Sequence, residues 1–226
     1  MANEKREDNG DIEECREERF ICVLDFEATC WENSNDHEII EFPSVLLKWR
    51  QTTDSKGKTS HTVKEISRIQ TYVKPKINPS VSKFCLDLTG ITQDTVNKGV
   101  PLKTAIRAHE DWLREHCGDD FEQNTTIVTC GNWDLQTMLP MDLKKTGLKT
   151  SKVYSKWVNI KEVFALITKT HSVPMVPMLK HFGLNLEGRH HSGIDDCHNI
   201  ARIFTKLVES GLKMSVFDAF VKSNKQ

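Results

Sequence analysis

The sequence predicts an α/β fold in which a mixed β-sheet is flanked by α-helices. Three observations support this: apolar strand-like segments come first, an amphipathic helical segment follows, and a further buried strand precedes several helical segments. The chain has 226 residues, of which 38% are hydrophobic and 28% are charged. This length and composition suit one globular domain with a substantial core.

Three strands are expected in the N-terminal third of the chain. They are FICVLDFE (20–27), IIEFPSVLLKW (39–49), in which Pro43 predicts a bulge or an edge position, and ISRIQTYVKP (66–75). The polar residues 50–64 include Gly57 and predict an exposed hairpin loop. Residues 1–19 are polar and predominantly acidic, which predicts a flexible N-terminal tail.

The remainder of the chain is mostly helical in pattern. Apolar residues follow helical spacing from Leu102 to Leu113, and Pro101 stands where a first helical turn tolerates proline. TTIVTCGN (125–132) predicts another buried strand. Further helices are expected near residues 134–147, 159–170, 175–182 and 193–210.

Composition narrows the class of protein. The N-terminus lacks the apolar core of a secretion signal, and no apolar run is long enough to span a bilayer. We therefore expect an intracellular protein, in the cytoplasm, the nucleus or both, without a membrane partner. Seven cysteines without a CxxC motif predict free thiols rather than disulfides or zinc. Six lysines between residues 144 and 161 form either a solvated face or a phosphate-contacting one.

Two carboxylates stand at the end of the first predicted strand. Asp25 and Glu27 share one face of an extended strand, with Phe26 on the other. Neighbouring carboxylates that are removed from water must be protonated or neutralised by a cation. Their oxygen atoms suit Mg²⁺ or Mn²⁺, although a strand end that emerges into solvent would explain the pair equally well.

Two further carboxylates follow later elements. Asp134 comes directly after the strand 125–132, at the sheet edge where ligands gather, and helix capping is the alternative. In the last helix, Asp196 heads a row that is otherwise apolar, whereas Asp195 heads a polar row. Asp196 is therefore predicted to face the core, although the helix dipole also favours both acids at this position.

A histidine precedes this helix in a glycine-containing loop. His191 is the candidate, and spacing alone does not decide between it and His190. Together, four carboxylates and a histidine are the groups used in two-metal phosphoryl transfer. The ions activate an attacking water and stabilise the leaving oxygen, while a histidine accepts a proton near neutral pH.

These residues lie in segments that resemble the DEDDh exonucleases of the RNase H-like superfamily, and within them the enhanced-RNAi group that includes the histone-mRNA 3′ exonuclease. The matching segments are VLDFEATC (23–30), HEIIEFPSVLL (37–47), YVKPKINPSVSKFCLDLTGITQDTV (72–96), GNWD (131–134), KWVNIK (156–161) and GRHHSGIDDCHNIARI (188–203). The resemblance implies an RNase H-like fold with one exonuclease domain over residues 20–222, an N-terminal tail over 1–19 and a C-terminal tail over 223–226.

The resemblance also implies a 3′→5′ exoribonuclease that uses two Mg²⁺ ions, with Mn²⁺ as a substitute, and releases nucleoside 5′-monophosphates. The family's spacing between its histidine and its last aspartate selects His191 and Asp196. Asp25 would bridge both ions, Glu27 and Asp196 would complete one site, and Asp134 would help to hold the other. His191 would act as general base.

The substrate-binding positions implied by the resemblance are Ala28, Phe84, Leu88, Thr89, Trp133, Arg189 and His191. Phe84 and Trp133 are expected beside the terminal base, which can stack on such rings largely regardless of sequence; core packing is the alternative for Phe84 and Leu88. The expected partner is RNA, especially single-stranded 3′ ends or overhangs, with DNA as a further candidate. A DNA-preferring exonuclease and a non-catalytic nucleic-acid-binding protein on the same fold are the alternatives.

Overall fold

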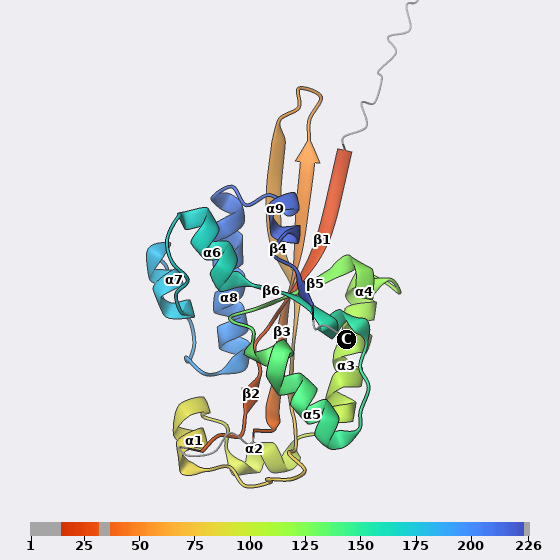
Figure 1. Ribbon diagram of the computed structural model, residues 1–226, viewed down its shortest axis with the longest axis vertical. Coiled ribbons are helices and arrows are strands. Elements are labelled where there is room, and N and C mark those ends of the chain that lie inside the picture. The colour runs from red at the N-terminus through yellow and green to blue at the C-terminus, as the bar shows by residue number, and fades with distance from the viewer. Residues whose placement is uncertain (1–14, 32–36, 224–226) are drawn as a thin grey trace, which may run out of the picture.

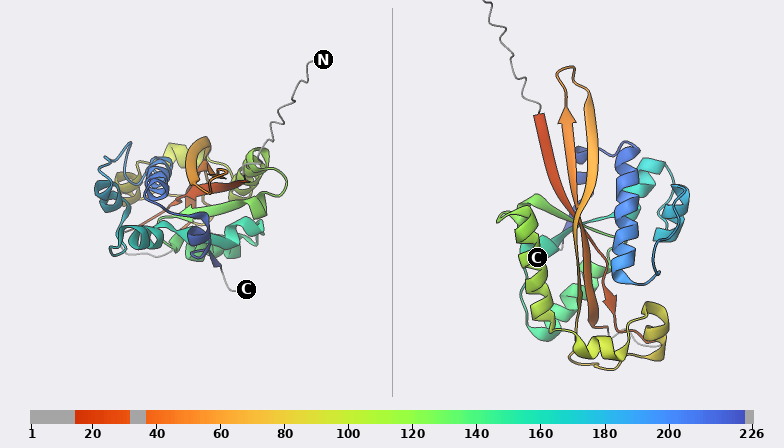
Figure 2. Two further views of the ribbon diagram at one scale, coloured as in Figure 1. Left: turned by 90° about the horizontal axis from the view of Figure 1, so that it is seen from above. Right: turned by 180° about the vertical axis from the view of Figure 1, so that it is seen from behind.

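Residues 15–31 and 37–223 are described by a computed structural model, in which a seven-stranded sheet carries helices on both faces (Figures 1 and 2). The strands are β1 (Cys15–Leu24), β2 (Glu27–Ala28), β3 (Ile39–Thr53), β4 (Thr59–Tyr72), β5 (Thr125–Thr129), β6 (Lys156–Asn159) and β7 (Lys222–Ser223). The helices are α1 (Lys83–Thr89), α2 (Gln93–Lys98), α3 (Leu102–Cys117), α4 (Phe121–Asn124), α5 (Leu139–Thr146), α6 (Ile160–Thr168), α7 (Met175–His181), α8 (Gly193–Glu209) and α9 (Met214–Asp218). A π-helical turn, η1 (Asp134–Met138), precedes α5, and a 3₁₀ turn, η2 (Lys152–Ser155), precedes β6. The predicted α/β class is confirmed.

Strand direction brings the ends of three strands to one edge of the sheet. β1 pairs antiparallel with β3 and parallel with β5, and β5 pairs parallel with β6. Because β1, β5 and β6 run in the same direction, the residues that follow them emerge at the same edge. β2 continues beyond β1 alongside β3, so that Glu27 lies opposite Glu41.

Each face of the sheet has its own hydrophobic core. Along β1, Ile21 and Val23 belong to one core and Cys22 and Leu24 to the other, as the alternation of side chains in a strand requires. The first core includes residues of α6, α7, α8 and α9, and the second includes residues of α3, η1 and α5. Figure 1 shows these helices on opposite sides of the sheet, and the rear view in Figure 2 agrees. With both faces covered, the carboxyl edge is where polar side chains can gather.

The first strand begins earlier than predicted. Residues 15–19 were expected in the tail, but they extend β1 and pair with residues 49–53 of β3. These polar residues form a strand because β3 provides a ladder for them, which sequence composition does not reveal. The rest of the two predicted tails, residues 1–14 and 224–226, lies outside the described residues, and Ser223 belongs to β7.

The predicted loop over residues 50–64 is also mostly strand. β3 and β4 continue until Thr53 faces Thr59, which leaves only residues 54–58 as the turn. Cross-strand hydroxyl contacts accompany this extension, at 2.7 Å between Thr52 and Ser60 and at 3.2 Å between Thr53 and Thr59. The hairpin therefore projects beyond the helices at the top of Figure 1.

Two short helices between β4 and α3 were not predicted. Ser82 caps α1 by accepting a hydrogen bond from the Cys85 N–H, and Thr92 caps α2 in the same way with Thr95. Gly90 ends α1 with a φ of 77°, a conformation that favours glycine. These helices form the lower end of the molecule in Figure 1. Among all the described helices, none combines the length and the apolar character needed to cross a membrane.

Candidate active site

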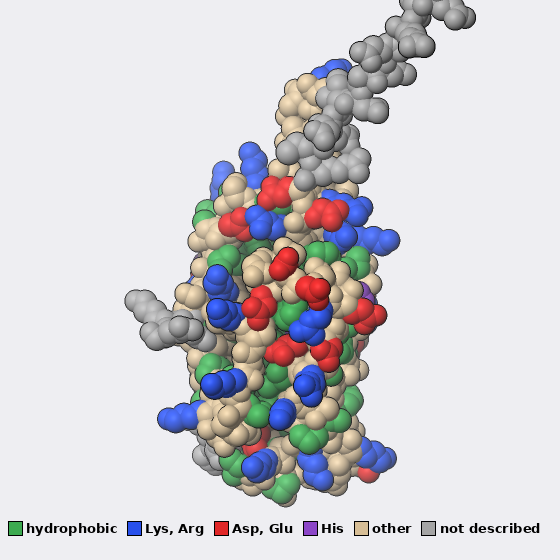
Figure 3. All heavy atoms as spheres, turned by 90° about the vertical axis from the view of Figure 1, so that its right-hand side faces the viewer, with side chains coloured by type: hydrophobic (Ala, Val, Ile, Leu, Met, Phe, Trp, Pro, Cys, Tyr) green, Lys and Arg blue, Asp and Glu red, His purple; other side chains and the backbone are tan. Residues whose placement is uncertain are grey.

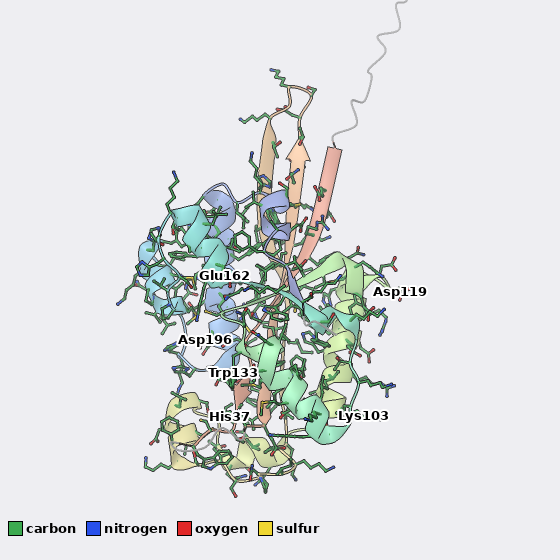
Figure 4. All side chains as sticks on the ribbon, in the orientation of Figure 1. His37, Lys103, Asp119, Trp133, Glu162 and Asp196 are labelled. Atoms are coloured by element: carbon green, nitrogen blue, oxygen red, sulfur yellow. The ribbon has the colours of Figure 1, made fainter. Side chains whose placement is uncertain are left out.

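The four predicted carboxylates come from four different elements and meet at the carboxyl edge of the sheet. Asp25 follows β1, Glu27 begins β2, Asp134 begins η1, and Asp196 lies in the first turn of α8. In Figure 4, Asp196 lies next to Trp133, the residue that precedes Asp134. The parallel course of β1 and β5 and the inward face of α8 thus assemble the site.

Three of these carboxylates are close enough to share a metal ion. One oxygen from each of Asp25, Glu27 and Asp196 lies within 4.8 Å of the other two. Asp196 is only 4% exposed; its Oδ2 accepts the His191 N–H at 2.9 Å, whereas its buried Oδ1 has no hydrogen-bond partner among the described residues. A buried oxygen without a donor costs about 1–3 kcal/mol. Oxygen-only ligands of this kind fit a hard divalent cation.

Asp134 stands beside this group of three. Its Oδ1 accepts the main-chain N–H of Phe26 at 2.9 Å, which ties η1 to the break between β1 and β2. The Asp134 carboxylate is only 8% exposed, and its charge contributes to raising the pKa of Asp25. Asp134 is therefore electrostatically part of the cluster.

Burial, together with mutual repulsion, disfavours the charged forms of these groups. Burial is the largest cause in each case: it raises the pKa of Glu27 to about 9 and the pKa values of Asp134 and Asp196 to about 6. Burial, followed by the charges of Asp134 and Glu27, also raises the pKa of Asp25 well above its ordinary value. The cluster thus holds more negative charge than the protein itself neutralises, a condition that a divalent cation relieves.

Both histidines of the loop before α8 lie near Asp196. A ring nitrogen from each of His190 and His191 lies within 4.8 Å of an Asp196 oxygen, and the rings stack with centroids 3.9 Å apart. His191 adopts a φ of 64°, held by its N–H bond to Asp196. Burial, followed by the charges of His190 and Arg189, lowers the pKa of His191. A neutral imidazole at physiological pH can accept a proton.

Sequence reasoning did not identify Glu41, which fixes the start of α8. This side chain is 1% exposed and accepts hydrogen bonds from the N–H groups of Gly193 at 3.2 Å and Ile194 at 3.3 Å and from Gln70 at 2.9 Å. The first N–H groups of a helix have no partner within it, so a carboxylate from β3 satisfies them. The available signal was a charged residue inside an otherwise apolar strand.

Gly193 allows α8 to approach β1 closely. A Cβ atom at this position would lie 2.7 Å from the Asp25 carbonyl oxygen and 2.7 Å from Pro43 Cγ. Such distances are too short for any side chain, so only glycine permits this packing. The close approach brings Asp196, one turn further on, to Asp25.

The two predicted aromatic contacts are both exposed. Trp133 is 51% exposed and its ring lies edge-on to His37, with centroids 6.5 Å apart. Phe84 on α1 is 42% exposed, which excludes the alternative of core packing for this ring. Leu88, on the same helix, is half-buried. Exposed rings near the carboxylate edge are available to a base.

Other predicted substrate positions are engaged within the protein. The Thr89 hydroxyl donates to the Cys85 carbonyl at 2.9 Å and accepts from the Ile91 N–H at 3.1 Å. Ala28 is buried and its carbonyl accepts the Cys85 thiol at 3.5 Å. These contacts anchor α1 against β2, so both residues hold the helix that carries Phe84.

Arg189 connects α1 to the loop before α8. Its Nη2 donates to the carbonyls of Asp87 at 2.8 Å and Leu88 at 3.3 Å, and its main-chain N–H donates to Asp195 Oδ2 at 2.9 Å. Carbonyls at a helix end need such partners. In this structure the guanidinium therefore positions α1 relative to the histidine loop.

Lys161, from the first turn of α6, brings a positive charge to the same edge. Its ammonium group lowers the pKa of Asp134, and its Nζ lies 3.7 Å from the position that a Cβ on Gly131 would take. Lys161 belongs to the lysine-rich segment noted in the sequence, in which the resemblance assigns no role to this residue.

The comparison with known families agrees with this geometry. The family described as exonuclease matches residues 22–204, most of the chain. The chain belongs to the exonuclease family. Among exonuclease relatives, 3'-5' exoribonuclease 1 of Mus musculus is 34% identical over 203 residues, which cover 87% of this chain and 55% of that protein. The 3'-5' exonuclease Snipper of Drosophila melanogaster is 30% identical over 213 residues, covering 87% of this chain and 72% of that protein.

Solved exonuclease structures share the fold. The nuclease domain of 3'hExo, described as a DEDDh family member bound to rAMP, has a TM-score of 0.73 at 32% identity and covers 92% of this chain and 96% of that chain. Cell-death related nuclease 4 (CRN-4) has a TM-score of 0.72 at 23% identity, which shows the fold alone. The predicted resemblance to DEDDh exonucleases is confirmed. This exonuclease-family chain spans about half the length of the mouse exoribonuclease, at 55%.

Proposed function

We propose that this chain is a divalent-metal-dependent 3′→5′ exoribonuclease that releases nucleoside 5′-monophosphates. The observation that carries the proposal is the group of Asp25, Glu27 and Asp196, whose oxygens lie within 4.8 Å of one another, with Asp196 Oδ1 buried and unpaired among the described residues. The names of the relatives, 3'-5' exoribonuclease and 3'-5' exonuclease, support this reaction. Mg²⁺ is the proposed ion and Mn²⁺ its substitute, because all the protein ligands are carboxylate oxygens.

Each carboxylate has a proposed place. Asp25, whose pKa responds to the charges of the other three groups, would contact both ions. Glu27 and Asp196 would complete one site, and Asp134 would help to hold the other. When bound, such ions stabilise charge on the phosphoryl oxygens and lower the pKa of water.

The histidine loop supplies the base. The neutral imidazole of His191 accepts the proton of the attacking water, and the Asp196 carboxylate holds the main chain of His191 at 2.9 Å. The lowered pKa of His191 keeps the ring unprotonated at neutral pH. His190 stacks on this ring and restrains its orientation.

The proposed substrate is RNA with an unpaired 3′ end, and DNA is a second one. Trp133 and Phe84 are exposed, and an unstacked base can lie on such rings. The 3'hExo nuclease domain bound to rAMP supports a nucleoside monophosphate as product. The proposed compartment is the cytoplasm, the nucleus or both.

The test is digestion of matched RNA and DNA oligonucleotides, labelled at the 5′ end, with Mg²⁺, Mn²⁺ or a chelator. Wild type should shorten RNA stepwise from the 3′ end and release mononucleotides, and Asp25→Asn should lower kcat at least ~100-fold. Asp119→Asn, an exposed acid far from the site in Figure 4, is the matched control. Equal trimming by wild type and Asp25→Asn would refute the proposal, and faster trimming of DNA would establish the DNA-preferring alternative.

A further inference from the structure

A second cavity, of about 540 Å³, lies outside the carboxylate cluster. It is formed by the start of β3, the segment after β4, the first turn of α3 and the end of α5. Four lysines line it, namely Lys74, Lys76, Lys103 and Lys145. On the face in Figure 3, lysine and arginine side chains are spread over the lower part of the molecule, below a group of acidic ones.

The lysine charges at this cavity are largely available. Lys74, Lys76 and Lys103 are exposed, and no ion pair joins any of them to a residue that the structure describes. Lys145 is half-buried; its Nζ donates to the His37 carbonyl at 2.8 Å and lies 3.8 Å from Asp142. The rim of the cavity is therefore positive.

The two acids in the cavity wall are occupied by main-chain donors. Glu38 accepts N–H bonds from Lys76 at 2.8 Å, from Ile77 at 3.0 Å and from Asn78 at 2.7 Å, and Asp142 accepts the Ile39 N–H at 2.8 Å. Both carboxylates thus hold the cavity wall in place. They leave the approach to the cavity to the lysine ammonium groups.

The wall between the lysines is apolar. Ile39, Val73, Pro75, Leu102 and Leu148 contribute to it. An apolar wall with a cationic rim matches a nucleotide, whose base and ribose carry flat, weakly polar surface and whose phosphate carries the charge. A membrane surface or an acidic peptide would not use an enclosed wall of this size in the same way.

The cavity is connected to the candidate active site through His37. Lys145 contacts the His37 main chain, and the His37 ring lies edge-on to Trp133, whose next residue is Asp134. Figure 4 shows Asp196, Trp133 and His37 one below another, with Lys103 beside the level of His37. A strand whose 3′ end lies at the carboxylates can continue past Trp133 and His37 to the lysine rim.

We propose that this cavity is a second nucleic-acid site, which takes a nucleotide of the RNA strand on the 5′ side of the segment held at the carboxylates. The choice of RNA rests on the proposed function; the placement rests on the lysine rim, the apolar wall and the contact chain through His37. Phosphates lie against Lys74 and Lys103, and a base lies against the apolar wall.

The test measures binding without hydrolysis. Wild type and Lys74→Glu/Lys103→Glu are titrated, in chelator, with a 5′-labelled dinucleotide, a longer single-stranded RNA and AMP. The double variant should bind the longer RNA about tenfold more weakly and with a shallower salt dependence, because each lost lysine–phosphate contact releases fewer counterions. Dinucleotide binding should be unchanged, since a dinucleotide does not reach the cavity.

The matched control is Lys64→Glu/Lys180→Glu, which changes the net charge equally at exposed positions on β4 and α7. An equal loss in this control, or no loss in the pocket variant, would overturn the proposal. AMP binding that the pocket substitutions weaken, with no effect of RNA length, would assign the cavity to a free nucleotide and also overturn it. A chain that binds long RNA through the cavity but hydrolyses nothing would uphold this site and refute the proposed exonuclease function.

Discussion

Glu27 and Asp25 are residues whose protonation couples stability to pH. The pKa of Glu27 rises from 4.5 to about 9 in the folded protein. Between these values the folded chain retains a proton that the unfolded chain has released, so the free energy of unfolding falls as pH rises. We expect the Tm of metal-free protein to fall from about pH 7 to about pH 9, and added Mg²⁺ to raise Tm more at the higher pH.

Thermal unfolding in chelator and in Mg²⁺, followed by circular dichroism, checks this expectation. Glu27→Gln should flatten the pH dependence and reduce stabilisation by the ion, whereas the exposed Asp119→Asn should change neither. A metal-free Tm that rises with pH over this range would contradict the assignment of Glu27 to a buried, metal-binding cluster.

His191 and His190 give a residue-level test of which ring is the base. If His191 is the base, His191→Ala should lower kcat by about 10²–10⁴-fold, and the acidic limb of the pH–rate profile, set by a pKa below 6.5, should disappear. His190→Ala is the matched neighbour and should retain that limb. The profile of kcat with a 5′-labelled RNA decides the assignment, and loss of the limb only in His190→Ala would reverse it.

The candidate residues could be predicted from sequence to different extents. Asp25, Glu27, Asp134 and Asp196 stand where period and strand ends place them, and the structure brings them together. Glu41 could not be assigned in this way, because its partners are main-chain N–H groups of α8, which is more than half the chain away. Contacts between distant segments have no local spacing to reveal them.

At the scale of elements, the seat of α8 on β1 depends on the missing side chain of Gly193. Gly193→Ala would place a methyl group 2.7 Å from the Asp25 carbonyl, so the first turn of α8 must shift and carry Asp196 away from Asp25. We expect kcat to fall by about 100-fold, since misplacement of roughly 1 Å has such effects. Ser192→Ala, whose side chain makes no capping bond, is the neighbouring control.

Two measurements separate geometry from folding in Gly193→Ala. Calorimetric titration of Mn²⁺ should show weakened binding, and urea unfolding should show a folded protein. Wild-type Mn²⁺ affinity in this variant would show that the close approach of α8 does not position the carboxylates.

Element prediction succeeded where periodicity was long and failed where signals were local or tertiary. α3 and α8 present apolar rows over several turns, which a sequence window detects. α1 and α2 have only seven and six residues, so their caps, Ser82 and Thr92, carry the information instead. The β3–β4 hairpin was mistaken for a loop because its strands are polar and gain their partners only in the folded sheet.

At the scale of the molecule, the sheet decides where chemistry can occur, and a histidine reports on the integrity of its core. His109 on α3 is 1% exposed and bonds to Tyr154 at 2.8 Å and to Ser44 at 2.9 Å, which joins α3, η2 and β3. Burial lowers its pKa from 6.5 to about 3. The neutral ring is thus part of the packed interior.

This depressed pKa predicts acid sensitivity of the whole fold. Below pH 6.5 the unfolded chain binds a proton at His109 that the folded chain does not, so the free energy of unfolding falls as pH decreases toward 3. His109→Gln should lose about 1–3 kcal/mol at neutral pH through its broken hydrogen bonds, yet show a shallower loss in acid. Urea unfolding across this range, with the exposed His171→Gln as control, tests it, and an unchanged acid slope in His109→Gln would count against this account.

The convergence of the carboxylates is a property of the whole molecule that sequence could only partly supply. Strand ends and an inward helix row indicated which acids belong together, and parallel pairing of β1 with β5 explains why they meet. The distances among their oxygens and the lysine-rimmed cavity depend on packing between segments far apart in the chain.

The π-helical turn η1 has one residue more per turn than an ordinary helix would allow between Asp134 and α5. That additional residue lets Asp134 face the carboxylates while Leu135 and Leu139 remain buried on the sheet. Shortening the turn by one residue would rotate everything beyond it by about 100°. A chain edited in this way would have to give up either its acidic group or its hydrophobic anchor, so the length of this one turn is as strictly constrained as any side chain in the cluster.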